Sequence, residues 1–358
     1  MKNYLHLLLA VLFVQAQAQT TISVDNSPGS GADYANVADA INAATTGDTI
    51  FIHPSATSYG NVSVTKKLHF VSLGHSPQYT QGMAAQLGNI TLDAAPAGAD
   101  GISFSGLRFG TLSLTNNSHS YNQVEILNCF FAGITAGTAG PGFRNNWVIA
   151  GCILESVSFN SITRTNGGGW MIMNNHLRNP SLNWSWNLFR NLDGSDTFRN
   201  NIVVTHQNPT GVNNEIRLFE NCVNLNIENS IILFLGAVET IFLTGNSLNY
   251  TNCLTYSYAG STLAPLTGTG NLNNTDPNFI DIGGNPSFNS SKNFNIQAGS
   301  PASSAGTDDQ DIGLYGNSFA FNAFGYPNQF PFISLMQILN AVVSPGGTLN
   351  VKIEATGN

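Results

Sequence analysis

A short strand-and-turn pattern recurs along the middle of this chain at intervals of 22 to 29 residues. Each copy has an apolar residue two positions before an Asn or Gly, and another apolar run follows. The copies begin at Phe104, Ile126, Ile149, Ile172, Phe198, Ile227 and Tyr250. A period of this length without helical spacing is typical of a solenoid, in which each turn buries its apolar side only against its neighbours. The repeat therefore constrains the architecture and leaves the chemistry open.

Asparagine is concentrated at the turns of this repeat. Asn adopts the left-handed backbone conformation more readily than other residues with a side chain, and its amide can bond to the coil above or below. We therefore interpret most of the Asn residues as turn or ladder residues rather than as contacts to a substrate. The clearest pairs are Asn145-Asn146, Asn174-Asn175, Asn200-Asn201 and Asn213-Asn214.

Three of the four cysteines, Cys129, Cys152 and Cys253, occupy the same position of the repeat. Equivalent positions on stacked parallel coils lie one strand spacing apart. We expect Cys129 and Cys152 to be vertical neighbours that form a buried stack of free thiols, and a disulfide between them is the alternative. Cys222 has no evident partner.

Residues 1–18 have the pattern of a secretory signal. Lys2 precedes the apolar run Leu7–Val14, and Ala16-Gln-Ala18 forms a cleavage site. The apolar run is too short to cross a bilayer, and no later stretch is long enough. We expect a secreted protein, extracellular or at the cell surface, with no transmembrane or lipid anchor.

The composition excludes two classes of protein. Only 9% of residues are charged while 42% are hydrophobic, the reverse of a disordered chain. The formal net charge of −8 argues against a nucleic-acid partner, which requires a basic surface. A polymer partner would have to bind through a local arrangement of charge.

The two ends of the repeat array differ from its middle. Apolar residues at Val37, Ala40 and Ile41 predict a capping helix over residues 34–44, which would cover the open end of the solenoid. We predict one solenoid domain over residues 19–316. The segment 317–358 reads as two strands around Ser344-Pro-Gly-Gly347, forming a closing β segment or appendage, with an export or partner-binding tail as the alternative.

Sequence motifs in both capping regions resemble those of secreted bacterial proteins of the pectin-lyase-like superfamily. The motifs are Ile22–Asp25, Pro28–Gly31 and Gly47–Ile50 near the start, and Thr275–Phe279, Gly299–Ala302, Ala305–Gly306 and Asp311–Gly316 near the end. With the repeats between them, the resemblance covers residues 20–316. It implies an all-β, right-handed parallel β-helix of about 23 residues per coil.

The same resemblance implies an extracellular, acidic polysaccharide as the partner. For lyases of the superfamily it implies a basic residue that abstracts a proton beside a uronate, often with Ca²⁺ neutralising the carboxylate. Catalysis of this kind needs a general base and stabilisation of the developing negative charge.

One stretch concentrates residue types that suit such a role. All four Trp lie between Trp147 and Trp186, and six of the seven Arg lie between Arg144 and Arg217. The irregular steps of 26 and 29 residues fall in or beside this stretch, and repeat insertions map to loops that often bind ligands. We select Arg164, Arg178 and Arg199 as candidate catalytic bases. The candidate substrate contacts are Trp170, Trp184, Trp186, Arg190 and His176.

Asp193 and Asp196 are the candidate Ca²⁺ ligands, since Ca²⁺ prefers carboxylate oxygens. Their Asp-Gly-Ser-Asp segment is equally the sequence of an ordinary turn. The Trp side chains could pack inward, and His176 follows a turn on an apolar strand that favours burial. Both alternatives stay open on the sequence alone.

Two functions compete. The first is a polysaccharide lyase or hydrolase, and the second is a non-catalytic glycan-binding protein, adhesin or surface scaffold. A glycosidase requires two carboxylates about 5 to 10 Å apart, and the sparse acidic residues of the middle coils offer no evident pair. The sequence leaves catalysis, the glycan, the metal and the oligomeric state undecided.

Overall fold

The computed structural model describes residues 19–356 apart from short stretches. The residues left out within that range are 79, 81, 94–99, 116, 137–139, 156–161, 180–187, 206–214, 237–239, 243–246, 317–318, 320, 328–330 and 341. The predicted secretory signal lies outside the described residues. Within them, no helix is long and apolar enough to cross a membrane.

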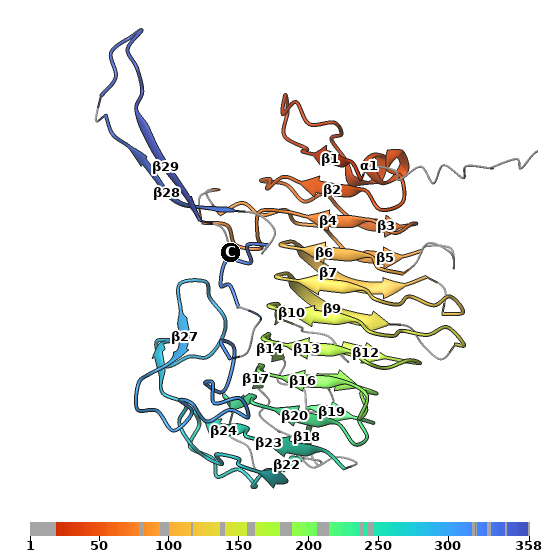
Figure 1. The fold of residues 1–358 in the computed structure, drawn as a ribbon, viewed down its shortest axis with the longest axis vertical. Coiled ribbons are helices and arrows are strands. Elements are labelled where there is room, and N and C mark those ends of the chain that lie inside the picture. The colour runs from red at the N-terminus through yellow and green to blue at the C-terminus, as the bar shows by residue number, and fades with distance from the viewer. Residues whose placement is uncertain are drawn as a thin grey trace, which may run out of the picture.

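Two long parallel sheets run the length of the molecule (Figure 1). In order, the first sheet contains β1 (Thr21–Val24), β2 (Thr49–Ile52), β4 (His69–Val71), β6 (Ser103–Ser105), β8 (Glu125–Leu127), β10 (Val148–Ala150), β13 (Met171–Met173), β16 (Thr197–Arg199), β20 (Asn226–Glu228), β23 (Asn249–Thr251) and β25 (Gly268–Thr269). Every strand pairs with its equivalent on the next coil, so the chain advances by one strand spacing per turn.

The second sheet closes the other sides of the coils. It contains β3 (Val62–Val64), β5 (Ile90–Leu92), β7 (Arg108–Leu114), β9 (Phe130–Ala136), β11 (Ile153–Glu155), β12 (Ile162–Arg164), β14 (His176–Asn179), β15 (Phe189–Arg190), β17 (Ile202–Thr205), β19 (Phe219–Glu220), β21 (Ile231–Phe234) and β24 (Leu254–Ser257). A separate parallel pair joins β18 (Glu215–Arg217) to β22 (Thr240–Phe242). Parallel strands joined by crossovers wind in the right-handed sense. The predicted right-handed parallel β-helix is confirmed.

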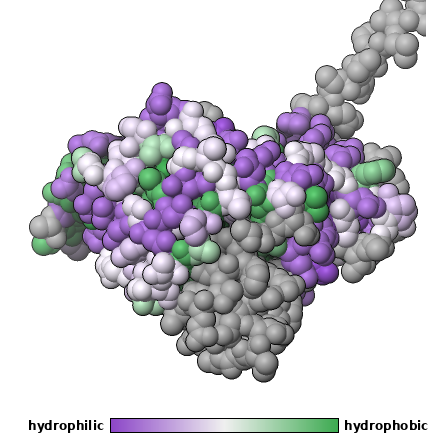
Figure 2. All heavy atoms as spheres, turned by 90° about the horizontal axis from the view of Figure 1, so that it is seen from below, coloured by the Kyte–Doolittle hydropathy of each residue, from purple (hydrophilic) through white to green (hydrophobic). Residues whose placement is uncertain are grey.

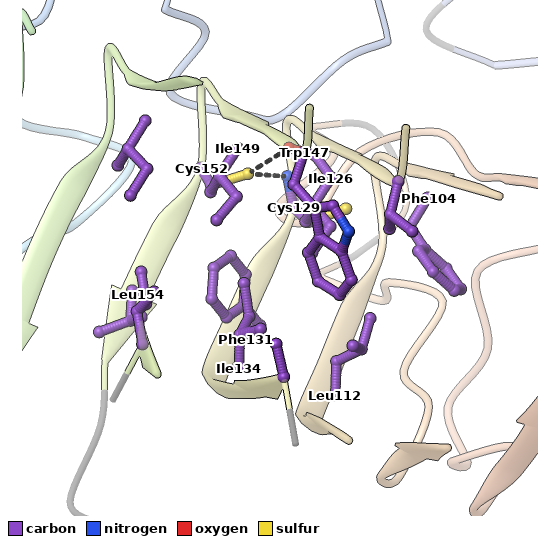
Figure 3. Packing of buried hydrophobic residues seen from close by; sticks show 14 of the residues in the cluster. Phe104, Leu112, Ile126, Cys129, Phe131, Ile134, Trp147, Ile149, Cys152 and Leu154 are labelled. Carbon is purple, nitrogen blue, oxygen red and sulfur yellow. Dashed lines mark hydrogen bonds between the residues drawn. The ribbon is translucent and has the colours of Figure 1, made fainter. Parts of the chain in front are cut away.

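The interior is built from rows of equivalent apolar residues. Ile126, Ile149 and Ile172 occupy one register position on successive coils, and each is completely buried. Trp147 points into the same interior, beside Phe131 and the two stacked cysteines (Figure 3). Stacked rings extend the rows, as with Phe70 on Phe104, whose ring centroids are 5.1 Å apart. This continuous core explains why each coil depends on its neighbours.

One corner of the β-helix is a row of residues in the left-handed conformation. Its members have φ angles between 49° and 69°. They are Gly106, Asn128, Gly151, Asn174, Asn200, Asn229, Asn252 and Gly270. Only Gly and Asn occur in this row, because the left-handed conformation brings the Cβ atom of most other residues too close to the backbone. The interpretation of these Asn residues as turn residues is confirmed.

The next row along the chain is a buried polar ladder. The side chain of Asn175 accepts the backbone N–H of Cys152 at 2.8 Å, and Asn201 accepts that of Asn175 at 3.0 Å. Cys129 and Cys152 belong to this row, and the backbone N–H of Cys129 lies 3.4 Å from the Cys152 sulfur. All four cysteines are buried and free. The predicted thiol stack is confirmed, and the alternative disulfide is wrong.

Both ends of the β-helix carry additional structure. Helix α1 (Val37–Ala43) is shorter than predicted, is capped by the Asn36 side chain on the Asp39 N–H at 2.8 Å, and buries Val37, Ala40 and Ile41. At the other end, β26 (Phe279–Asp281) and β27 (Asn293–Ile296) form an antiparallel hairpin. It packs Phe279 and Phe294 against the outer face of the second sheet, covering Ile202, Ile231 and Leu254.

We call the described residues of 275–327, which include this hairpin, the closing segment, and after the hairpin it runs back along the corner row. Corner amides hold it: Asn252 donates to the Ala305 carbonyl at 2.8 Å, Asn200 to that of Gly313 at 3.2 Å and Asn174 to that of Leu314 at 2.7 Å. At its far end the Tyr326 hydroxyl accepts the backbone N–H of Gln78 at 2.9 Å. The closing segment thus joins distant coils. The predicted domain boundary at residue 316 stays a prediction.

The chain ends in an antiparallel ribbon of β28 (Phe332–Ile338) and β29 (Val351–Thr356). Figure 1 shows this ribbon projecting away from the β-helix. Seen from below in Figure 2, the described part of the surface is mostly hydrophilic, with small hydrophobic patches among the hydrophilic residues. The role of segment 317–358 as a closing β segment or appendage stays a prediction.

Candidate functional site

The predicted bases do not meet in one place. Arg164 on β12 is buried, with 2% of its side chain exposed, and binds two carboxylates, those of Asp193 and Asp196. Its Nε also donates to the Asn191 carbonyl at 3.1 Å. An arginine held by this many internal partners acts in structure, so its selection as a catalytic base is wrong.

Trp170 is a core residue and not a sugar platform. It is completely buried and stacks on Trp147, with ring centroids 4.7 Å apart and planes 1° from parallel. Its indole N–H donates to the Arg144 carbonyl at 2.9 Å. The assignment of Trp170 to substrate binding is wrong, because the ring is in the inward-facing row. Trp184 and Trp186 lie outside the described residues.

The predicted Ca²⁺ ligands belong to the Arg164 network. Asp196 accepts Arg164 Nη1 at 2.9 Å, the Trp170 N–H at 2.9 Å and the Asp193 N–H at 2.8 Å. Burial raises the pKa of Asp196 even though Arg164 and these hydrogen bonds oppose the shift. Across the described residues no three His, Cys, Asp or Glu side chains gather as metal ligands do. The two carboxylates do not fit a Ca²⁺ site here.

Two other predicted residues make separate ion pairs. Arg190 on β15 lies 3.2 Å from Glu220 on the adjacent strand β19, and 37% of its side chain is exposed. Arg199 at the end of β16 lies 3.1 Å from Asp308 of the closing segment. The Arg199–Asp308 pair joins the closing segment to the first sheet. Arg190 lies on the second sheet, so the two arginines do not share a site.

Arg178 is the predicted residue that lies within a larger charged cluster. Its Nη1 is 2.8 Å from Oε1 of Glu155, which occupies the same register position one coil earlier. Both side chains point outward from the second sheet and are partly exposed, at 19% for Arg178 and 30% for Glu155. The two side chains therefore form a surface pair that a ligand can reach.

Two more cations complete this cluster. Arg108 on β7 lies over the Phe130 ring, 4.4 Å from its centroid, and burial lowers its pKa while Glu155 opposes the shift. Lys292 comes from the closing segment, and its pKa is lowered by burial and then by the charge of Arg178. Its ammonium donates to the Asn285 and Ser287 carbonyls at 2.6 and 2.8 Å.

We call Arg108, Glu155, Arg178 and Lys292 the cationic cluster. Glu155 is paired with Arg178, the charge of Glu155 acts on Arg108, and the charge of Arg178 acts on Lys292. The four side chains together carry a net charge of +2 on a chain of −8. The buried Nε of Arg178 has no hydrogen-bond acceptor. An excess of cations at a surface that a ligand can reach favours an anion, and guanidinium groups match a carboxylate with two parallel hydrogen bonds.

Two buried histidines lie beneath the cluster. His176 is completely buried, its Nε2 lies 2.7 Å from the Pro286 carbonyl, and burial lowers its pKa to about 4. His75 is also completely buried, and burial together with Arg108 lowers its pKa to about 3. The Phe288 ring lies between them, 5.9 Å from His75 and 5.7 Å from His176.

These histidines are neutral at pH 7 and act in packing. His176 was predicted to contact substrate, and its complete burial shows that this is wrong. Its ring instead anchors the closing segment, because the carbonyl of Pro286 and the ring of Phe288 both come from that segment. The closing segment is thereby held where it contributes Lys292.

Sequence reasoning missed Arg108, Glu155 and Lys292. A usable signal existed for Glu155, which is 23 residues before Arg178 and therefore one coil away on the same row. Arg108 could have been placed by the same spacing, because it belongs to the row that continues through Phe130, Ile153 and His176. No repeat spacing relates Lys292 to this row, since the closing segment lies outside the array.

The comparisons with known proteins add little. No protein-family model matches this chain, and no curated protein matches it. Among solved structures it is similar to a pectin methylesterase from Aspergillus niger in deglycosylated form, at 10% identity over 69% of this chain and 90% of the other, with a TM-score of 0.42. It is also similar to the pectate lyase Pel9A, at 13% identity over 84% of this chain and 97% of the other, with a TM-score of 0.35. With both TM-scores below 0.5, these similarities decide nothing about activity.

Proposed function

We propose that this chain is a secreted β-helix protein that binds an acidic polysaccharide through the cationic cluster. The observation that carries the proposal is the excess of three cations over one carboxylate in this cluster, with Glu155 and Arg178 partly exposed on the outer face of the second sheet. The carboxylate of a uronate would supply the missing negative charge and bind the guanidinium groups. The resemblance of the capping motifs supports a polysaccharide as its source.

Arg178 is the residue that tests this proposal. We expect Arg178→Gln to weaken binding to polygalacturonate about tenfold or more, because one charge-assisted pair contributes 1.5–3 kcal/mol. Isothermal titration calorimetry at low and physiological salt measures the effect. The matched control is Arg190→Gln, which removes an equally charged side chain paired with Glu220 outside the cluster. Equal losses in the two variants would mean that binding depends on overall charge and not on this cluster.

The number of carboxylates in the cluster favours binding of the polysaccharide without its cleavage. Glu155 is the one carboxylate in the cluster, while acid–base hydrolysis of a glycoside uses two. A β-elimination at the same site is the second candidate, favoured by Lys292, whose pKa is lowered beside Arg178. Absorbance at 235 nm during incubation with polygalacturonate separates the two. If the absorbance at 235 nm rises with the wild-type chain and does not rise with Lys292→Met, the protein is a lyase and the proposal of binding without cleavage is wrong.

A further inference from the structure

We propose that the C-terminal ribbon is a self-association surface through which two copies of this chain pair face to face. Strands β28 and β29 are joined only to each other in their sheet. A two-stranded ribbon is marginally stable in water by itself. A second surface that covers its exposed apolar side chains would therefore stabilise it.

The two faces of the ribbon differ sharply. Met336 lies opposite Ile353, and Ile338 lies opposite Val351, so these four side chains form one apolar face. Their exposed fractions run from 41% to 62%. The other face carries Leu335, Gln337 and the Lys352–Glu354 ion pair, whose charged atoms are 2.6 Å apart. The ribbon is thus amphipathic, with its apolar face in water.

Further exposed aliphatic side chains follow toward the tip of the ribbon. Beyond β28 and before β29, four more aliphatic side chains are between 37% and 85% exposed. They are Leu339, Val342, Val343 and Leu349. Exposed aliphatic side chains gathered in one part of a molecule, unlike single scattered ones, mark an interaction surface.

A second copy fits this surface better than a charged partner does. Lys352 and Glu354 are the charged residues of segment 332–356, so the ribbon has no net charge despite the −8 of the chain. Two ribbons can therefore approach without repulsion. An apolar face of equivalent rows is complementary to itself, which is the requirement of a two-fold symmetric interface. Two ribbons stacked in this way form a small β sandwich with a buried interior.

Light scattering after size exclusion tests the proposal on the full chain. We expect a dimer at micromolar concentration, and Ile353→Glu should shift its dissociation constant by about a hundredfold or more, because a buried charge would face the partner ribbon. The control Gln337→Glu places the same charge on the polar face and should leave the dimer intact. A monomeric wild-type chain would overturn the proposal, as would a dimer that Ile353→Glu leaves unchanged.

A second measurement guards against a variant that merely unfolds the ribbon. The four native cysteines are buried, so a thiol introduced at Met336 reacts alone. Under mild oxidation Met336→Cys should give a disulfide-linked dimer, whereas Gln337→Cys, on the outer face, should not. Equal crosslinking of both variants would contradict face-to-face pairing. This test does not involve the cationic cluster, so its outcome is independent of glycan binding.

Discussion

Asp196→Ala is expected to lower the free energy of unfolding by about 3–5 kcal/mol, the usual cost of removing one partner from a buried ion pair. Asp196 has no exposed side-chain area, and Arg164 would lose its 2.9 Å contact while staying buried. The backbone N–H groups of Asp193 and Trp170 would lose their acceptor as well. Urea unfolding followed by circular dichroism measures the loss.

The accompanying variants separate the ion pair from general effects of substitution. Lys352→Ala removes one partner of a pair that is about half exposed, and we expect a change of no more than about 1 kcal/mol. The double variant Arg164→Met, Asp196→Leu should recover part of the stability lost in Asp196→Ala, because it leaves less buried charge unpaired. If Asp196→Ala lowers the free energy of unfolding no more than Lys352→Ala does, the contacts of Asp196 with Arg164 do not stabilise the fold.

Acid is expected to destabilise the fold through the two histidines beneath the cluster. Burial lowers the pKa of His176 to about 4 and that of His75 to about 3, whereas an unfolded His titrates near 6.5. Above pH 6.5 neither state binds the proton, so the stability is fully present there. Below pH 6.5 these histidines bind protons in the unfolded chain and stay neutral in the folded chain, so falling pH favours the unfolded state. Each histidine should therefore cost about 2–3 kcal/mol by pH 4.5.

Urea unfolding at pH 8 and pH 4.5 tests this expectation. The lower limit stays at 4.5 because the pKa of Asp48, which burial raises but hydrogen bonds from Thr20 and Thr45 lower to about 2, adds a carboxylate effect in stronger acid. In His176→Gln the difference in stability between the two pH values should shrink by about 2–3 kcal/mol. A difference as large as that of the wild type would show that His176 titrates normally.

The repeat spacing was sufficient to predict a solenoid, because every coil has the same local pattern, and the resemblance of the capping motifs added the right-handed parallel β-helix. An apolar strand residue followed by a left-handed Asn or Gly fixes both the inward row and the corner. The same spacing placed Cys129 beside Cys152 correctly. The residues of each coil contain this short-range pattern, so it can be recognised without information on the tertiary packing of the rest of the chain.

The site was harder to predict because its residues are not neighbours in the repeat. Selecting by residue type gave Arg164 and Trp170, which the fold uses inside the molecule, as the buried ion pair and the Trp stack show. Arg178 was found for its type, but its partner Glu155 required the register of two coils. Lys292 arrives on the closing segment, whose path depends on tertiary packing around His176.

The most direct test of the central claim changes the ligand and leaves the protein intact. If the cationic cluster recognises carboxylates, the wild-type chain should bind unesterified polygalacturonate, and methyl esterification of the same polymer should weaken that binding about tenfold or more. Calorimetric titration of the two polymers at matched chain length and physiological salt makes the comparison. Equal affinity for the charged and the esterified polymer, or no binding to either, would contradict the account.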